Sequence, residues 1–348
     1  MDNFELFYGH YILGRFLMED YRFFDTGVER GYFVILSGDY DDYDVELLKR
    51  NRIFKETYVY KDEGRIAVML IEDKRERFPT LNVVMFLLTL LSTFFVGALQ
   101  LGYNPFGPDI LKGWIFSIPL LSILGAHEFG HFIVARRYGI PTSWPYFIPF
   151  PSIIGTMGAV IRLRGFIPSR RALLHMAFAG PIAGFIVALP VLWMGLKLSK
   201  LERAVFEEGV FFGEPLIFKL FSYMIFGNVG DNLVINIHPL AFAGWVGIFV
   251  TALNLIPMGQ LDGGHIFYAL FPKYHRIVGW IVVILLIIGG IYWSGWFIWA
   301  FFGIFVGVYH PPAAFMERKL KPVDYIIGAL SVIMFILCFI PVPVRVLF

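Results

Sequence analysis

Two histidines and a glutamate in the stretch "GAHEFGHFIVARRYG" (residues 125–139) have the types and spacing of side chains that hold a metal ion. His127 and His131 are four residues apart, so a helix places both imidazoles on one face, about 6 Å apart, where two nitrogens suit one tetrahedral zinc ion. Glu128, beside the first histidine, is placed to accept a proton from a water molecule at the metal. Surface residues on a soluble helix can match HExxH by chance. In an apolar helix this alternative weakens, because an unpaired glutamate near a membrane core costs on the order of several kcal/mol.

The third ligand does not follow the patterns of soluble HExxH enzymes. A metzincin has glycine and histidine where this chain has Val134 and Arg137. A thermolysin-like enzyme uses a glutamate about twenty to twenty-five residues downstream, but no Asp or Glu occurs between Glu128 and Glu202. The later acids are Glu202, Glu207, Glu208, Glu214, Asp231, Asp262, Glu317 and Asp324. These are the later carboxylates available to complete the site.

The composition indicates a membrane protein with several spans. Of the 348 residues, 57% are hydrophobic and 16% are charged, whereas about 25% are charged in a typical soluble domain. The formal net charge of +2 gives no reason to expect a nucleic-acid partner. The single cysteine, Cys338, excludes an intramolecular disulfide and a CxxC zinc site. The N-terminus lacks the features of a signal peptide, so we expect the first apolar segment to direct insertion.

Seven apolar stretches predict membrane-spanning helices. They are residues 81–101, 113–137, 171–196, 240–258, 276–292, 295–311 and 323–341. The fifth and sixth stretches, on either side of "WSGW", are short and can alternatively form one re-entrant hairpin. The predicted fold class is therefore a polytopic α-helical membrane protein with about six or seven transmembrane helices.

The basic residues predict the orientation of these spans. Lys and Arg gather in five clusters, at residues 74–77, 136–137, 162–171, 273–276 and 318–321. With seven spans every cluster falls on one side, and the positive-inside rule makes that side cytoplasmic. We expect a multi-pass protein of the cell membrane with its N-terminal region in the cytoplasm and the loop 197–239 outside.

This orientation singles out Asp262 among the later acids. The fourth span runs inward, so "NLIPMGQLDGG", which contains Asp262, lies at its cytoplasmic end. His131 lies within about two turns of Arg136, at the same end of the second span. Pro257 breaks the helix, and its glycine neighbours allow an irregular backbone, which is tolerated at this depth only beside protein or a water-filled cavity. The two motifs share a depth, which makes Asp262 the candidate to complete the site; a solvated helix end is the alternative.

HExxH together with N-x-x-P-x-x-x-x-D-G resembles the motif pair of the site-2 protease family of intramembrane zinc metalloproteases. The resemblance implies that His127, His131 and Asp262 bind one zinc ion per chain. It also implies that Glu128 is the general base and that Asn254 stabilises the oxyanion or orients the substrate. An interhelical hydrogen bond is the alternative role for Asn254.

Other stretches agree with this resemblance, which covers roughly residues 80–310. "PYFIPFPSIIGTMGAVIRL" (145–163) looks like the membrane-associated β segment of the family, particularly of its archaeal and plant-chloroplast branch. "AGPIAG" (179–184) looks like its small-residue motif in the third span, where small side chains let helices approach closely. We therefore expect a short β segment beside the active site.

The N-terminal region is expected to be a small α+β soluble domain. "GYFVILSG" is typical of a strand, "DVELLKRNRIF" of a short helix and "YVYKDEGRIAVMLIED" of a hairpin turning at Asp62-Glu63-Gly64; a lone amphipathic appendage is the alternative. The predicted domains are a cytoplasmic domain over 1–78, an intramembrane metalloprotease core over 79–312 and an additional transmembrane helix over 313–348.

The resemblance implies hydrolysis of peptide bonds within or near transmembrane segments of membrane-anchored substrates, as in regulated intramembrane proteolysis. The expected partners are these substrates and the lipid bilayer, and the sequence does not indicate an oligomeric state. Residues 145–163 are expected to receive an unwound substrate by β-addition.

Two other classes of function are the alternatives. A zinc transporter would carry further acids along its spans, and an inactive scaffold would typically have lost Glu128 or a ligand. A CAAX-type membrane protease would use a downstream glutamate as ligand. Among the other histidines, His265 is either a fourth ligand or a polar residue at a helix start, and His175 is expected to be a paired residue near the membrane interface.

Overall fold

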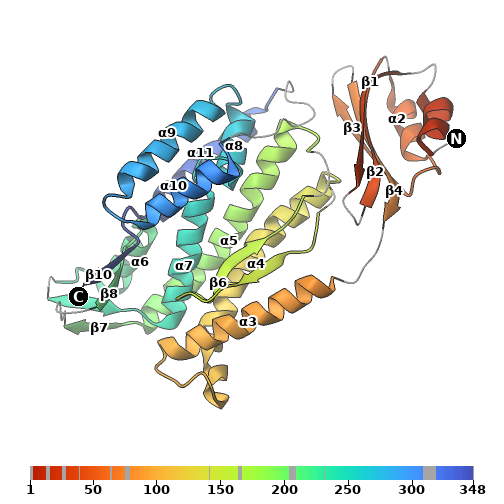
Figure 1. Ribbon diagram of the computed structural model, residues 1–348. Helices are drawn as coiled ribbons and strands as arrows, with labels where there is room; N and C mark the ends of the chain where they lie inside the picture. Colours follow the sequence, from red (N-terminus) through yellow and green to blue (C-terminus); the bar gives the residue numbers. More distant parts are fainter. Residues whose placement is uncertain are drawn as a thin grey trace.

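The computed structural model describes residues 3–12, 16–25, 29–38, 40–62, 65–74, 79–140, 142–163, 167–203, 209–230, 232–308 and 319–347. Within them, a small β-rich region at the N-terminus is followed by a bundle of apolar helices (Figure 1). The bundle carries the HExxH motif on α4 (Trp114–Arg137).

The N-terminal region is a four-stranded antiparallel sheet in the order β1-β2-β4-β3. Its elements are α1 (Asn3–Phe7), a π-helical turn (Tyr8–Ile12), β1 (Leu17–Asp25), β2 (Glu29–Ser37), α2 (Asp42–Lys49), β3 (Glu56–Asp62) and β4 (Arg65–Lys74). Successive strand residues point to opposite faces, so Val34 and Leu36, two residues apart, share a face and pack against Phe7 and Leu48 of the helices. The predicted strand, helix and hairpin are confirmed, whereas β1 is not among the predicted elements. Residues 63–64 of the predicted turn lie outside the described residues.

The predicted helix in this region is shorter than its sequence pattern suggests. Asp41 caps its start by accepting a hydrogen bond from the backbone N–H of Asp44. The helix ends at Lys49, and the Asn51 side chain then donates to the carbonyl of Leu48. The backbone N–H of Asn51 donates to the same carbonyl at 3.4 Å, so main chain and side chain together close the end of the helix, and "NRIF" continues as a loop.

The second face of the sheet touches the turn that follows α4. Tyr58 and Tyr60 lie against Gly139, where a Cβ atom would come within 2.8 Å of the Tyr60 hydroxyl oxygen. Gly139 has a φ of +64°, a conformation that glycine adopts without the cost that other residues incur. Burial raises the pKa of the Tyr60 hydroxyl, and the neighbouring Tyr58 adds to this effect.

The bundle is built from apolar helices, as its sequence predicts. Its helices besides α4 are α3 (Thr80–Gln100), a 3-10 turn (Pro108–Gly113), α5 (Arg170–Leu198), α6 (Leu216–Phe226), α7 (Pro239–Asn254), α8 (Asp262–Leu270), α9 (His275–Gly289), α10 (Gly295–Val306) and α11 (Pro322–Cys338). Three stretches of the described chain, Thr80–Gln100, Pro108–Arg137 and Arg170–Leu198, are long and apolar enough to cross a membrane. The other apolar helices are shorter. The length and apolar composition of these helices fit a membrane protein.

The helix bounds agree with the predicted stretches to within a few residues, except in two places. Helix α7 ends at Asn254 and not at 258, because Pro257 has no N–H to continue the helical hydrogen bonds. Helix α10 ends at Val306, and residues 309–318 lie outside the described residues.

Three two-stranded antiparallel sheets join the helices. They are β5 (Tyr146–Pro149) with β6 (Thr156–Val160), β7 (Lys200–Arg203) with β9 (Leu233–Asn236), and β8 (Gly209–Phe212) with β10 (Val344–Leu347). The first pair confirms the predicted β segment. The other two pairs and α6 lie wholly or partly in the loop 197–239 and are not among the predicted elements.

Helix α5 lies between α4 and α7 and packs most extensively against these two helices (Figure 1). Small residues make this possible, because a Cβ atom on Gly130 would overlap the backbone of Ala179, and one on Gly244 would come within 2.7 Å of the backbone of Leu192. The central position of α5 brings its residues directly against the HExxH face of α4.

Candidate metal centre

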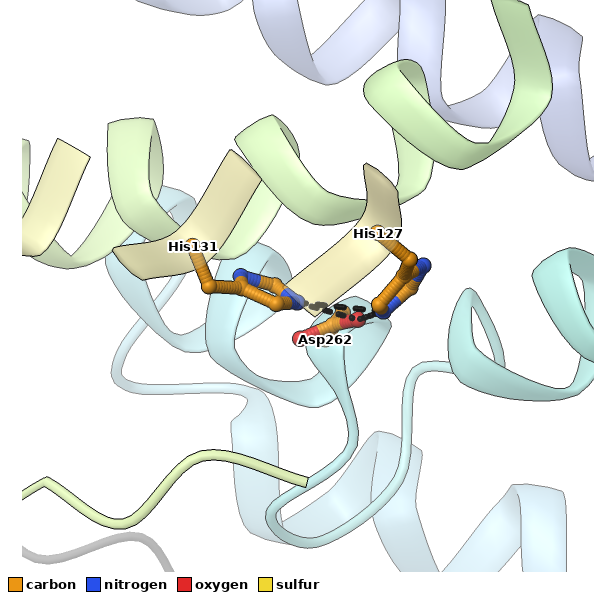
Figure 2. Close-up of side chains that lie close together, drawn as sticks. All are labelled: His127, His131 and Asp262. Atoms are coloured by element: carbon orange, nitrogen blue, oxygen red, sulfur yellow. Dashed lines mark hydrogen bonds and ion pairs between the residues drawn. The ribbon is translucent and has the colours of Figure 1, made fainter. Parts of the chain in front are cut away.

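The three predicted ligand residues meet at one point (Figure 2). His127 and His131 lie on α4, and Asp262 is the first residue of α8. The Nε2 atoms of the two histidines are 3.1 Å apart. One carboxylate oxygen of Asp262, Oδ2, lies 3.2 Å from Nε2 of His127 and 3.3 Å from Nε2 of His131. Both histidines are buried, and the Asp262 side chain is 14% exposed.

This triangle fits a tetrahedral metal ion. Zinc binds imidazole nitrogen and carboxylate oxygen at about 2.0–2.2 Å, which places two ligand atoms of a tetrahedron roughly 3.3 Å apart. The three measured separations, 3.1, 3.2 and 3.3 Å, are close to that value. Two nitrogens and one oxygen are also a donor set typical of catalytic zinc, which leaves a fourth position open. The residues present therefore fit a zinc ion.

The tautomer of His131 agrees with this fit. Its Nδ1 atom lies 2.8 Å from the carbonyl oxygen of Met176 on α5. A carbonyl oxygen only accepts hydrogen bonds, so Nδ1 carries the proton and Nε2 keeps its lone pair. The Met176 carbonyl thus turns the metal-binding nitrogen of His131 toward His127 and Asp262.

Two glycines of α5 lie against the histidine rings. A Cβ atom on Gly180 would overlap the ring of His131, and one on Gly184 would come 3.2 Å from Cβ of His127. The "AGPIAG" motif therefore gives the two imidazoles the room they occupy between α4 and α5.

Glu128 lies beside the triangle, next to strand β6. It is 7% exposed, and its carboxylate accepts a hydrogen bond from the backbone N–H of Ile161, which directly follows β6. Residues Ala159–Ile161 and Glu128 line the same cavity as the three ligand residues. A carboxylate fixed in this way is placed to exchange a proton with a molecule held at the triangle.

Asn254 ends α7 within reach of the same point. Its Nδ2 atom lies 3.3 Å from Nε2 of His127. The asparagine of the predicted motif is thus an amide donor beside the ligand atoms, and the contact also joins α7 to α4. This position suits either role of Asn254, the stabilisation of an oxyanion or orientation of a substrate, or an interhelical hydrogen bond.

Asp262 reaches α4 because the chain turns back sharply after α7. The turn includes Gly259, which has a φ of +55°. A Cβ atom on Gly263 would overlap the backbone carbonyl of Leu255. The glycines of the "LDGG" stretch therefore let the start of α8 pack directly on the turn.

The ligand triangle borders a cavity of about 240 Å³ that His265 also lines. His265 is in the first turn of α8, as predicted for a polar helix start. Among the described residues, the group with metal-ligand atoms within 4.8 Å of one another consists of His127, His131 and Asp262. A larger cavity of about 1160 Å³, beside α6, β8 and β9, includes none of these three residues.

Two groups at this site are not predictable from the sequence, the carbonyl of Met176 and the N–H of Ile161. Both belong to the backbone, which every residue carries, so no residue type marks them in a sequence. His175, by contrast, is paired as predicted, with Tyr138 and Asp324.

Comparisons with known proteins agree with this geometry. The model of the family described as Peptidase family M50 matches residues 115–289, which is 175 of the 348 residues. No solved structure matches the chain.

Several plant proteins are similar to the chain. "Probable zinc metalloprotease EGY2, chloroplastic" of Oryza sativa subsp. indica is 32% identical over 168 residues, which are 47% of this chain and 31% of that protein. "Probable zinc metalloprotease EGY1, chloroplastic" of Arabidopsis thaliana is 34% identical over 159 residues, 44% of this chain and 29% of that protein. "Probable zinc metallopeptidase EGY3, chloroplastic" of Arabidopsis thaliana is 26% identical over 325 residues, 80% of this chain and 56% of that protein.

The chain spans about a third of the length of the first two of these relatives. The family model covers half of the chain, and its matched range includes the HExxH helix, the Asn254 position and Asp262. On that ground the chain belongs to peptidase family M50, the family of the site-2 proteases.

Proposed function

We propose that this chain is a zinc endopeptidase that hydrolyses peptide bonds within or near the transmembrane segments of membrane-anchored proteins. The observation that carries the proposal is the triangle of ligand atoms from His127, His131 and Asp262, beside the buried Glu128 carboxylate, in a bundle of apolar helices. Membership of family M50 and the zinc metalloprotease names of the plant relatives support it.

The proposed chemistry follows from these side chains. When bound, zinc would act as a Lewis acid toward the scissile carbonyl and the attacking water. Glu128, held by the N–H of Ile161, accepts the proton of that water and passes it to the leaving amine. The Asn254 amide, beside His127, donates to the oxygen that becomes negatively charged.

The free edge of β6 is the proposed receiver of the substrate. Successive residues of a strand direct their backbone groups to opposite edges, so residues two apart share an edge. Because Ile161 directs its N–H toward Glu128, Ala159 directs its N–H and C=O to the same edge. A substrate segment unwound from its helix would pair there as a third strand, with its carbonyls at the ligand triangle.

The wider arrangement is part of the proposal. The chain would cross the cell membrane six or seven times, with α9 and α10 either as two spans or as one re-entrant hairpin. With 15 and 12 residues these helices measure about 22 and 18 Å, less than the ~30 Å of a hydrocarbon core. The N-terminal domain and the active site would face the cytoplasm, as the basic clusters predict, and the partners would be transmembrane substrates and lipid.

The substitution Glu128→Gln tests the proposal. Purified wild-type protein should carry about one zinc ion per chain and cleave a transmembrane substrate in micelles or vesicles. The variant should keep its zinc and lose cleavage, because Glu128 handles protons and is not part of the triangle. Zinc uptake into vesicles by both proteins without cleavage would favour the transporter, and loss of zinc from the variant would make Glu128 a ligand.

A further inference from the structure

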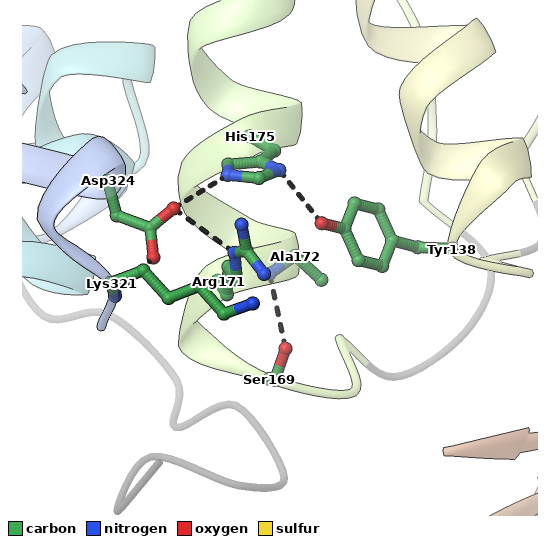
Figure 3. Close-up of polar contacts among 7 residues, drawn as sticks. All are labelled: Tyr138, Ser169, Arg171, Ala172, His175, Lys321 and Asp324. Atoms are coloured by element: carbon green, nitrogen blue, oxygen red, sulfur yellow. Dashed lines mark hydrogen bonds and ion pairs between the residues drawn. The ribbon is translucent and has the colours of Figure 1, made fainter. Parts of the chain in front are cut away.

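A second polar network lies at the start of α5 and centres on Asp324 (Figure 3). Asp324 is in the first turn of α11 and is completely buried. Its Oδ1 accepts hydrogen bonds from Nε of Arg171 at 3.1 Å and from Nε2 of His175 at 2.9 Å. Its Oδ2 accepts the backbone N–H of Lys321 at 2.8 Å. Both carboxylate oxygens are therefore bonded, as a buried charge requires.

The network extends from α5 to the end of α4. Nδ1 of His175 lies 2.8 Å from the hydroxyl of Tyr138, which directly follows α4 and is seven residues after His131. Because Nε2 of His175 faces a carboxylate, it carries the proton, and in the neutral imidazole Nδ1 accepts the Tyr138 O–H. One imidazole thus joins α4 to α11.

The neighbouring arginine joins the same end of α5 to α8. Nε and Nη2 of Arg170 donate to the carbonyls of Ala269 and Leu270 at 2.8 and 3.0 Å. These carbonyls end the helix that Asp262 begins, and a cation is favourable there. Leu270 also packs on α11, where a Cβ atom on Gly328 would lie 2.5 Å from its Cδ1.

The network is adjacent in sequence to a group that orients a ligand of the metal centre. His175 precedes Met176, whose carbonyl accepts Nδ1–H of His131 and so orients its metal-binding nitrogen. The same helix places Gly180 against the His131 ring. A shift of α5 at His175 would therefore move both groups that set the position of this ligand.

We propose that Asp324, Arg171, His175 and Tyr138 are positioning residues that hold the end of α4 and the start of α5 beside the ligand triangle, with α11 as the anchor, while Arg170 joins the same end of α5 to α8. Helix α11 lies outside residues 115–289, the range that the family model matches. The sites of metal binding on α4 and α8 are thus fixed in part by a helix that contributes no ligand. Where the inference concerns catalysis it rests on the proposed function, but its test is metal affinity.

The substitution Asp324→Asn is the first test. It keeps the shape of the side chain but removes the charge that Arg171 and His175 share. Zinc affinity, measured by competition with a chromogenic chelator, should fall about 10- to 100-fold, as for other groups that orient metal ligands. The absorption bands of the cobalt-substituted protein should change as well, because they depend on the arrangement of ligands.

A milder pair of variants covers the case in which Asp324→Asn does not fold. Tyr138→Phe removes one hydroxyl and should lower zinc affinity about fivefold, for one neutral hydrogen bond. Ser331→Ala is the matched control, because this buried hydroxyl of α11, among the residues that the structure describes, bonds only within its own helix, to the Ile327 carbonyl at 2.8 Å. The control should lower thermal stability slightly and leave zinc affinity and the cobalt spectrum unchanged.

The positioning role would be overturned if Tyr138→Phe, or a folded Asp324→Asn protein, kept wild-type zinc affinity and an unchanged cobalt spectrum. Asp324 would then contribute to stability alone. Equal loss of affinity in Ser331→Ala would do the same. A wild-type protein that binds zinc but cleaves nothing would refute the proposed function and leave these affinity comparisons to decide the inference.

Discussion

Gly180 offers the most direct test of how α5 shapes the metal centre. A Cβ atom at this position would overlap Nε2, Cδ2 and Cε1 of the His131 ring. The nearest ring atom would lie 2.0 Å from the new Cβ, so in Gly180→Ala the ring must move by about 1.4 Å to restore van der Waals contact, whereas zinc–ligand distances tolerate only about ±0.2 Å. The substitution therefore removes His131 from the triangle without changing the residue itself.

The expected loss is large. Zinc sites in small proteins bind with roughly 10–16 kcal/mol from four ligands, so one ligand contributes about 3 kcal/mol, and Gly180→Ala should weaken zinc binding by roughly 100-fold. Alanine is a better helix former than glycine by about 1 kcal/mol. A general loss of helical structure is thus not expected from the change.

Alanine substitutions at two further glycines should affect zinc affinity less than Gly180→Ala does. In Gly184→Ala the new atom would lie 3.2 Å from Cβ of His127, a contact that a shift of a few tenths of an ångström relieves, so a smaller loss is expected. In Gly125→Ala, on α4, the nearest neighbour is 3.7 Å away, and zinc affinity should not change. The assay is chelator competition on the three purified variants. Wild-type affinity in Gly180→Ala, or the reverse order in the series, would refute the reasoning.

Three other outcomes are expected. Asp262→Ala should lose zinc or bind it far more weakly, since two imidazoles alone chelate poorly; full zinc content would turn attention to His265. Ala159→Pro lacks the N–H at the free edge of β6 and should abolish cleavage with zinc retained, while Ala159→Ser keeps that N–H and should cleave. Equal cleavage rates in the two variants would exclude substrate pairing at β6. Gln260→Cys, in the cavity wall, in a Cys338→Ser background should react with a polar thiol reagent in inverted vesicles but not in intact cells; labelling from outside would reverse the proposed orientation.

Much of the fold can be predicted from the sequence because its signals are local. Long apolar stretches predict α3, α4 and α5 to within a few residues, since burying apolar surface and pairing every backbone group favour helices in lipid. Pro257 marks where α7 stops, although the predicted stretch runs four residues too far. The β5–β6 hairpin is predicted from its resemblance to a family segment.

Four of the elements missing from the prediction are short strands whose partners lie farther along the chain: β8 pairs with β10, and β7 pairs with β9. Strand β1 pairs with the next strand, β2, and forms an edge of the sheet. Short strands of four residues, such as β7 to β10, carry too few residues for a period of two to be recognised. Their pairing is a tertiary contact.

The residues that can do chemistry here are recognisable from residue type and spacing alone: HExxH on an apolar helix, and Asn254 and Asp262 on either side of a turn rich in glycine. How close they come, and which groups orient them, depends on the packing of the helices. The 3.1–3.3 Å triangle, the Met176 carbonyl on His131 and the Ile161 N–H on Glu128 arise where four segments pack together. Side-chain chemistry is a property of residue type. The distance between His127 and Asp262, which are 135 residues apart in the chain, results from helix packing. The backbone groups that orient the ligands are present in every residue, so residue type does not identify them.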